Sequence, residues 1–192
     1  MKAKRGKHGG FTLFELMVTV GIMGILTTIV VANYRGFEKQ TVLDNLALDV
    51  SLSVRLAQVY GLNVKGAGGS DPFNTSYGIH LARNQKTQYI LFRDANRSVG
   101  GFVYGGDSVK VYTLQKNYTI SDVCADRTTG TTDCFSGSMS RLDIVFDRPR
   151  PDAIFTSNIG GATYERAVIT LRSPDGLEKS VEVLSTGYIS VQ

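Results

Sequence analysis

The feature that most constrains this chain is a nearly uninterrupted apolar run close to its N-terminus. The run extends over 22 residues, from Phe11 to Ala32, and Glu15 is its only charged residue. A helix of this length spans about 33 Å, roughly the thickness of the hydrocarbon core of a bilayer. The basic segment MKAKRGKHGG precedes the run and predicts that this end of the chain stays in the cytoplasm. The sequence therefore predicts one membrane-spanning helix that holds an acid near its start.

Three kinds of membrane segment must be weighed against this pattern. A secretory signal peptide has a shorter apolar region and a cleavage site of small residues after it, and no such site follows here. A plain signal anchor fits the length and the basic leader but gives no reason for the acid. Cleavage between Gly10 and Phe11 gives one, because the new α-amino group lies four residues from Glu15. In a filament of packed helices the cation can belong to a neighbouring subunit, and such a buried pair selects one register between subunits.

The residues Gly10–Leu16, with the sequence GFTLFEL, resemble the cleavage and methylation motif of type IV prepilins and type II secretion pseudopilins. The resemblance covers the leader and the first helix, about residues 6–35. It implies cleavage after Gly10 by a prepilin peptidase of the membrane, N-methylation of Phe11 by the same enzyme, and a role for Glu15 in assembly with other pilin or pseudopilin subunits. It also implies a single-pass inner-membrane protein whose larger part lies outside the cytoplasm before it enters a pilus or pseudopilus. The chain departs from the family at Ala32, where many members have a helix-kinking proline.

Beyond Ala32 the pattern becomes amphipathic. Apolar residues recur at steps of three and four, which marks one face of a helix: Leu43, Leu46, Val50, Val54 and Ala57. We expect one helix from about Phe11 to Tyr60, with Gly61 near its end. Its apolar stripe is expected to pack on the same chain rather than on a separate partner helix. The predicted organisation is a leader over residues 1–10, a membrane or filament-core helix over 11–35, an amphipathic helical half over 36–62, and a β-rich domain over 63–192.

The rest of the chain reads as an antiparallel β-domain. The segment Lys65–Pro72 is a loop by composition, and Ser173–Gly176 predicts a tight turn that joins two strands into a hairpin. Short alternating or β-branched runs predict strands at Tyr77–Ala82, Gln88–Phe92, Val109–Leu114, Tyr118–Val123, Leu142–Phe146, Ala167–Leu171, Leu177–Leu184 and Tyr188–Val191. The expected fold class is α+β, a long N-terminal helix packed on an antiparallel sheet domain. This architecture and its closing hairpin resemble the GspH/FimT group of minor pilins and pseudopilins.

The two cysteines have two readings. A domain that has crossed the membrane folds in an oxidising compartment, where Cys124 and Cys134 would form a disulfide around residues 125–133. Such a bridge would stabilise the fold by roughly 3 kcal/mol on the chain-entropy estimate. Two free thiols are the alternative.

The positive charge of the chain is concentrated in its leader. The net charge is +4, but four of the 21 basic residues and none of the 17 acidic ones lie in residues 1–10, so the remainder has 17 of each. A small cluster remains at Arg141, Arg148 and Arg150, and some relatives bind DNA through basic residues near the C-terminus. Aspartates alternate with these arginines, which favours a solvated strand edge over a phosphate-binding surface.

Little in the sequence points to catalysis. After removal of the leader only His80 remains as a histidine, inside a predicted strand, and no nucleophile motif of the G-x-S-x-G type occurs. We expect no enzyme activity, no cofactor and no metal site. The expected function is that of a minor, pilin-like structural subunit. The alternatives are a pseudopilin of type II protein secretion and a DNA-binding minor pilin for DNA uptake.

Overall fold

The computed structural model describes residues 10–192, except residues 64–74, 95–101 and 116, and omits the side chains of residues 32–38. Residues 1–9 of the predicted leader and the whole of the predicted loop Lys65–Pro72 lie outside the described residues. The chain divides into two compact units, residues 1–39 and residues 40–192. Helix α1, Leu13–Leu62, contributes its first part to one unit and its second part to the other. It begins two residues later and ends two residues later than the sequence predicts.

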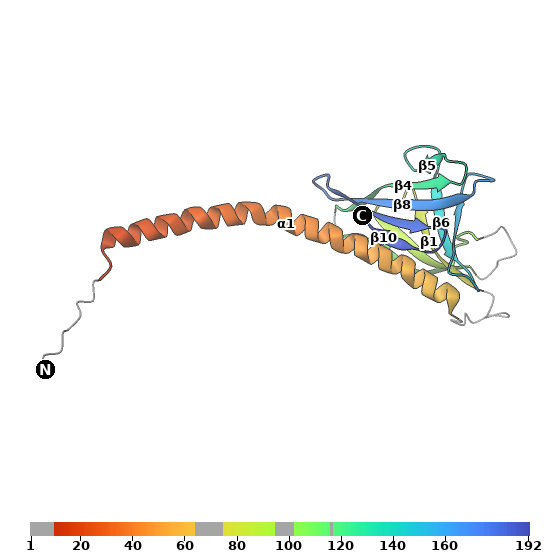
Figure 1. The fold of residues 1–192 in the computed structure, drawn as a ribbon, viewed down its shortest axis with the longest axis horizontal. Coiled ribbons are helices and arrows are strands. Elements are labelled where there is room, and N and C mark those ends of the chain that lie inside the picture. The colour runs from red at the N-terminus through yellow and green to blue at the C-terminus, as the bar shows by residue number, and fades with distance from the viewer. Residues whose placement is uncertain (1–9, 64–74, 95–101, 116) are drawn as a thin grey trace. The chain divides into compact units, whose positions relative to one another are not determined.

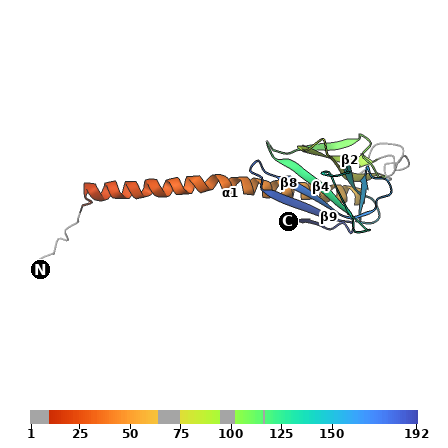
Figure 2. The same cartoon turned by 90° about the horizontal axis from the view of Figure 1, so that it is seen from above.

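The second unit contains ten strands in the described residues, arranged in two antiparallel five-stranded sheets (Figure 1). The first sheet has the order β3-β2-β1-β6-β7, with strands β1 Ser76–Ala82, β2 Gln88–Asp94, β3 Ser108–Thr113, β6 Arg141–Phe146 and β7 Ala153–Ser157. The second has the order β10-β9-β8-β4-β5, with strands β4 Thr119–Arg127, β5 Thr132–Cys134, β8 Tyr164–Arg172, β9 Glu178–Leu184 and β10 Ile189–Val191. In Figure 2, β2 marks the first sheet, and β4, β8 and β9 mark the second. The expected α+β class with an antiparallel β-domain is confirmed.

One hydrophobic core joins residues 40–62 of α1 to both sheets. All five residues of the predicted stripe are buried: Leu43, Leu46, Val50, Val54 and Ala57. They pack with residues of the first sheet, such as Ile79 and Ile144, and of the second, such as Ile169 and Val183. Because the helix repeats every 3.6 residues, its apolar side chains lie on one side and pack with the inner faces of the two sheets. Every second residue of a strand contributes its side chain to such a face. The expectation that this stripe packs within the same chain is confirmed.

Gly61 has a different role from the one that the sequence suggests. It is buried inside the last turn of α1 and does not end the helix. A β-carbon at this position would overlap the backbone carbonyl of Phe146, the last residue of β6. The absence of a side chain thus allows the helix to approach the end of the first sheet closely.

The strand predictions miss two elements and shorten several others, β4 and β8 most of all. β5 and β7 were not predicted: β5 has three residues and only one of them is apolar, and β7 follows a segment with two prolines. Strands β4 and β8 extend to Arg127 and back to Tyr164, beyond the predicted limits, because their pairing continues into polar residues. The segment between the cysteines, read as a loop, is a hairpin of β4 and β5. The turn at Ser173–Gly176 does connect β8 to β9, with Gly176 at a positive φ of 86°.

Candidate functional site

The N-terminal helical segment exposes an unbroken apolar surface. Every residue from Phe11 to Val31 is exposed, and Phe11 itself is 76% exposed. The part Leu13–Val31 is long and apolar enough to cross a bilayer, and none of it is buried within the chain. Folding of the described chain leaves this surface uncovered, so lipid or other protein must cover it.

Thr12 sets the start of the helix. Its hydroxyl oxygen accepts a hydrogen bond of 3.2 Å from the backbone N–H of Glu15. Thr12 is therefore the N-cap of α1, and Glu15 occupies the third helical position, as in the T-x-x-E capping pattern. A carboxylate there also meets the positive end of the helix dipole. The sequence analysis did not identify this cap, although the pattern is readable from the four residues.

The polar side chains further along the helix bond to the helix itself. The hydroxyl groups of Thr19, Thr27 and Thr28 donate to backbone carbonyls three or four residues earlier, at 2.7–2.9 Å. They present little unsatisfied polarity to lipid. Glu15 differs, because no ion pair connects its carboxylate to another part of the described chain. The carboxylate is thus available to a cation on another molecule.

Gly10 and the two glycines within the apolar helix, Gly21 and Gly24, have open space where a side chain would be. At Gly10, the residue before the predicted cleavage point, the backbone is therefore accessible. At Gly21 and Gly24 the helix offers small positions at which another helix backbone can approach.

Cys124 and Cys134 form a disulfide that joins β4 to β5. The two residues are direct cross-strand partners in the hairpin, and their Cα atoms are 4.0 Å apart. The structure therefore has the predicted disulfide and not two free thiols. Asp122 lies close to both sulfur atoms, but sulfurs that are bonded to each other are not thiolate ligands for a metal.

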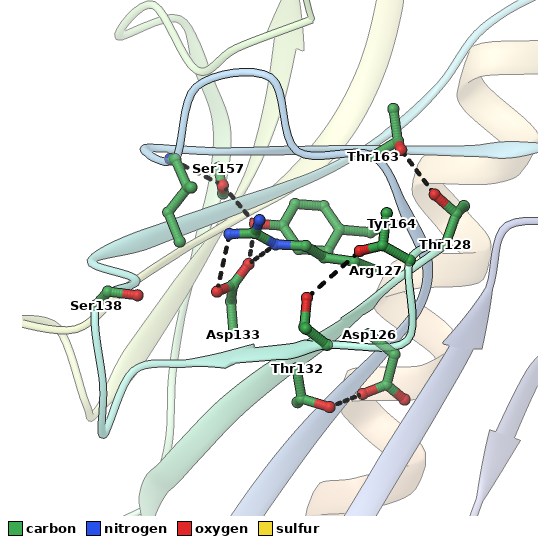
Figure 3. Close-up of polar contacts among 12 residues, drawn as sticks. Asp126, Arg127, Thr128, Thr132, Asp133, Ser138, Ser157, Thr163 and Tyr164 are labelled. Atoms are coloured by element: carbon green, nitrogen blue, oxygen red, sulfur yellow. Dashed lines mark hydrogen bonds and ion pairs between the residues drawn. The ribbon is translucent and has the colours of Figure 1, made fainter.

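A charged network anchors this hairpin to the neighbouring strands (Figure 3). Asp133 of β5 accepts hydrogen bonds from Arg127 Nε at 2.5 Å and Nη2 at 3.1 Å. It also accepts one from the Tyr164 hydroxyl at 2.9 Å. Because that hydroxyl has only one proton, Ser157 must donate to Tyr164 across their 2.9 Å contact. The network therefore connects the hairpin to the end of β7 and the start of β8.

The ionised state of Asp133 holds these hydrogen bonds together. The Arg127 guanidinium, more than any other group, lowers the pKa of Asp133 below its usual value. Burial and the neighbouring Asp133 raise the pKa of Tyr164, so that its hydroxyl remains a donor. Sequence reasoning missed these residues, since Arg127 and Asp133 lie within the segment read as a loop and Tyr164 lies 31 residues further on.

The three arginines of the candidate DNA-binding cluster do not form one patch. Arg141 begins β6, whereas Arg148 and Arg150 lie in the connection after that strand. A six-residue strand separates the two sites by about 20 Å. Arg148 and Arg150 line a surface hollow of about 390 Å³ together with Asp147 and Asp152. The aspartates offset the arginine charge there.

His80 is paired inside the first sheet. Its Nδ1 lies 2.6 Å from Oδ1 of Asp143, a fully buried residue directly across the strand pair, and its ring packs on Tyr104 at 4.6 Å. The side chain of His80 is only 11% exposed. This arrangement is that of a histidine held within the sheet by hydrogen bonding.

Comparison with known proteins adds one match, at the N-terminus. Residues 5–31 match the family model described as the prokaryotic N-terminal methylation motif. No curated protein and no solved structure matches the chain. The match covers residues 5–10 of the predicted leader, the predicted cleavage point, Glu15 and the exposed helical surface described above. The chain thus carries a type IV pilin-like prepilin signal, which supports a place in the pilin and pseudopilin family.

Proposed function

We propose that this chain is a minor, pilin-like structural subunit of a type IV pilus or pseudopilus, of the GspH/FimT kind. The observation that carries the proposal is the exposed apolar helix Leu13–Val31 with Glu15 as its only ionisable group. A helix of this kind has two suitable environments, the bilayer and a bundle of similar helices. The methylation motif over residues 5–31 supports transfer of this helix from the bilayer into a bundle of similar helices.

In this proposal, prepilin peptidase hydrolyses the Gly10–Phe11 bond and then methylates the new amino group of Phe11. The methylated amine remains a cation. It lies close to the Glu15 carboxylate of its own or of a neighbouring subunit, and the pair compensates the cost of burying the acid. Because only one axial offset brings amine and carboxylate together, the pair also fixes the register between subunits.

The β-domain lies outside the cytoplasm in this proposal. The basic leader favours a cytoplasmic N-terminus, and a single span then carries residues 40–192 to the other side. The Cys124–Cys134 disulfide agrees with folding in an oxidising compartment. The domain performs no chemistry here and serves in contacts with other subunits.

The experiment that tests this proposal measures how much of the subunit enters the filament fraction. In cells that assemble the filament, Glu15→Ala and Glu15→Gln should leave the protein in the membrane fraction, since removal of a charge favours insertion. Both variants should be lost from the filament fraction. Thr28→Val, which changes a polar residue of the same helix that is bonded to its own backbone, should enter filaments normally. Normal incorporation of both Glu15 variants would refute the role of this acid.

Two alternatives share the same N-terminal segment. A pseudopilin of type II secretion differs in the machine that it joins, and copurification with pilus or secretion components distinguishes the two. A DNA-binding minor pilin requires a basic surface, and the separated arginines and their aspartate neighbours disfavour it. Salt-dependent binding that Arg148→Ala with Arg150→Ala abolishes would favour DNA uptake, because each lost phosphate contact reduces the salt slope by about one unit.

A further inference from the structure

We propose that a hollow at one end of the β-domain binds a carboxylate attached to a small apolar group. The hollow has a volume of about 240 Å³ and lies between the β1–β2 turn and the β4–β5 hairpin. Arg83 and Lys86 come from the turn, Ile120 from β4, and Phe135 and Ser136 from the residues after β5. The inference rests on these residues alone and is independent of the function proposed above.

Two cations reach the hollow without an acidic partner in the described chain. Neither Arg83 nor Lys86 takes part in a salt bridge among the described residues. Arg83 donates from Nη2 to the carbonyl of Gly137, while its Nε is buried without a hydrogen-bond acceptor there. A buried guanidinium N–H without an acceptor is costly, and an anion that enters the hollow would remove this cost.

One acid, Asp122, adjoins the hollow through its contact with Ser136 but forms no salt bridge with Arg83 or Lys86. Asp122 accepts hydrogen bonds at Oδ1 from the backbone N–H groups of Val123 and Ser136, at 2.9 and 3.1 Å. Its position is therefore determined by the backbone next to the hollow. The Ser121 hydroxyl donates to the carbonyl of Thr170. In the described residues these polar groups bond to the backbone and not to Arg83 or Lys86.

Two buried apolar side chains also line the hollow. Ile120 and Phe135 are 5% and 8% exposed, and Ser121 and Ser136 line it with them. Cations beside an apolar surface favour an anion with an apolar body over a bare inorganic ion. The volume is small for a ligand pocket and suits a group the size of benzoate or of one residue at a polypeptide C-terminus.

Benzoate and its neutral isostere benzamide test this assignment. The ¹⁵N-labelled full-length chain in non-ionic detergent micelles is titrated with each compound and followed by amide chemical shifts. We expect saturable shifts at Ser121, Phe135 and Ser136 with benzoate, and at least tenfold weaker binding of benzamide. Equal binding of the two compounds, or no saturable shift at these amides with benzoate, would overturn the proposal.

Matched lysine variants locate the site. Lys86→Gln should weaken benzoate binding about tenfold or more, the scale of one lost charge-assisted hydrogen bond. Lys110→Gln removes the same charge from β3, which contributes no residue to the lining of the hollow, and should leave binding unchanged. Arg83→Gln should also weaken benzoate binding. Because that change also removes the hydrogen bond to Gly137, Lys86→Gln is the variant that tests the site. Unchanged binding in Lys86→Gln would contradict the site.

A comparison of two peptides distinguishes between two sources of the carboxylate. A tetrapeptide that ends in phenylalanine is compared with the same peptide amidated at its C-terminus. Binding of the free acid at least as tight as benzoate binding, and lost on amidation, supports capture of a polypeptide C-terminus. Binding of benzoate but of neither peptide supports a free small carboxylic acid.

Discussion

Gly61 of α1 lies directly against the backbone carbonyl of Phe146 at the end of β6. The helix and the first sheet approach each other here more closely than a residue with a side chain would allow. This contact ties the end of the amphipathic half of the helix to the end of β6 in the first sheet. It is therefore a sensitive point for the stability of residues 40–192.

Gly61→Ala should destabilise the β-domain although alanine favours helices. The added β-carbon overlaps the Phe146 carbonyl, and such overpacking costs about 1–3 kcal/mol of the free energy of unfolding. Gly160→Ala, at a position with open space, is the control and should have little effect. Denaturant unfolding of the full chain in detergent, followed by tyrosine fluorescence, measures both. Equal stability of the two variants would show that the contact is not tight.

Tyr89 should make the domain sensitive to high pH. Its ring stacks on Tyr112 at 5.0 Å, its hydroxyl lies 3.0 Å from Ser53, and burial above all raises the pKa of Tyr89 to about 12. Because folding raises this pKa, the contribution of the neutral Tyr89 hydroxyl to the free energy of unfolding is complete below the pKa of tyrosine in the unfolded chain, near 10. That contribution is lost as pH rises towards 12.

Wild type should therefore lose more stability than Tyr89→Phe between about pH 9 and pH 11.5, by about 2 kcal/mol. Denaturant unfolding of both proteins at the two pH values measures the difference. Tyr188→Phe, at an exposed position, is the control and should follow wild type. Parallel curves for wild type and Tyr89→Phe would contradict a raised pKa.

Asp133 should make the disulfide hairpin sensitive to low pH. The pKa of Asp133 is lowered, so its contribution is present above the unfolded value near 4 and is lost as pH falls below it. Asp133→Asn should destabilise the domain by about 1–3 kcal/mol at neutral pH, because Arg127 and Tyr164 lose a charged acceptor. The difference from wild type should shrink towards pH 3. Asp152→Asn, at an exposed position, should show neither effect. A pH-independent difference for Asp133→Asn would show that its charge is not involved.

The sequence predicts the helix and most strands because their signals are local. The apolar run with Glu15 is recognised by its length, and the stripe from Leu43 to Ala57 follows the period of a helix. Strands such as β6 and β9 are rich in β-branched residues and end at turn residues. Polar strands lack this signal, so β5 with its sequence TDC could be found only through its pairing with β4.

The contacts that organise the domain depend on pairing and could not be read from local pattern. The Asp133–Tyr164 contact and the pocket of Arg83 and Phe135 each join residues from different sheets or hairpins. The position of Gly61 against Phe146 likewise follows from how the helix packs, and the sequence alone favoured a helix end. In contrast, the predicted cleavage point and Glu15 lie within six residues of each other, so the motif that the family model matches could be recognised from a short stretch of sequence.

The mass of the mature protein shows whether the chain is processed as a pilin-type subunit. The full-length chain is produced in cells with an active prepilin peptidase, and its intact mass and N-terminal peptide are determined. We expect a protein that lacks residues 1–10 and begins with Phe11 bearing one methyl group on its amine. Gly10→Val should remain unprocessed, because a branched side chain adjoins the scissile bond. A mature protein that retains Met1–Gly10, or one that begins at any residue other than Phe11, would contradict this expectation.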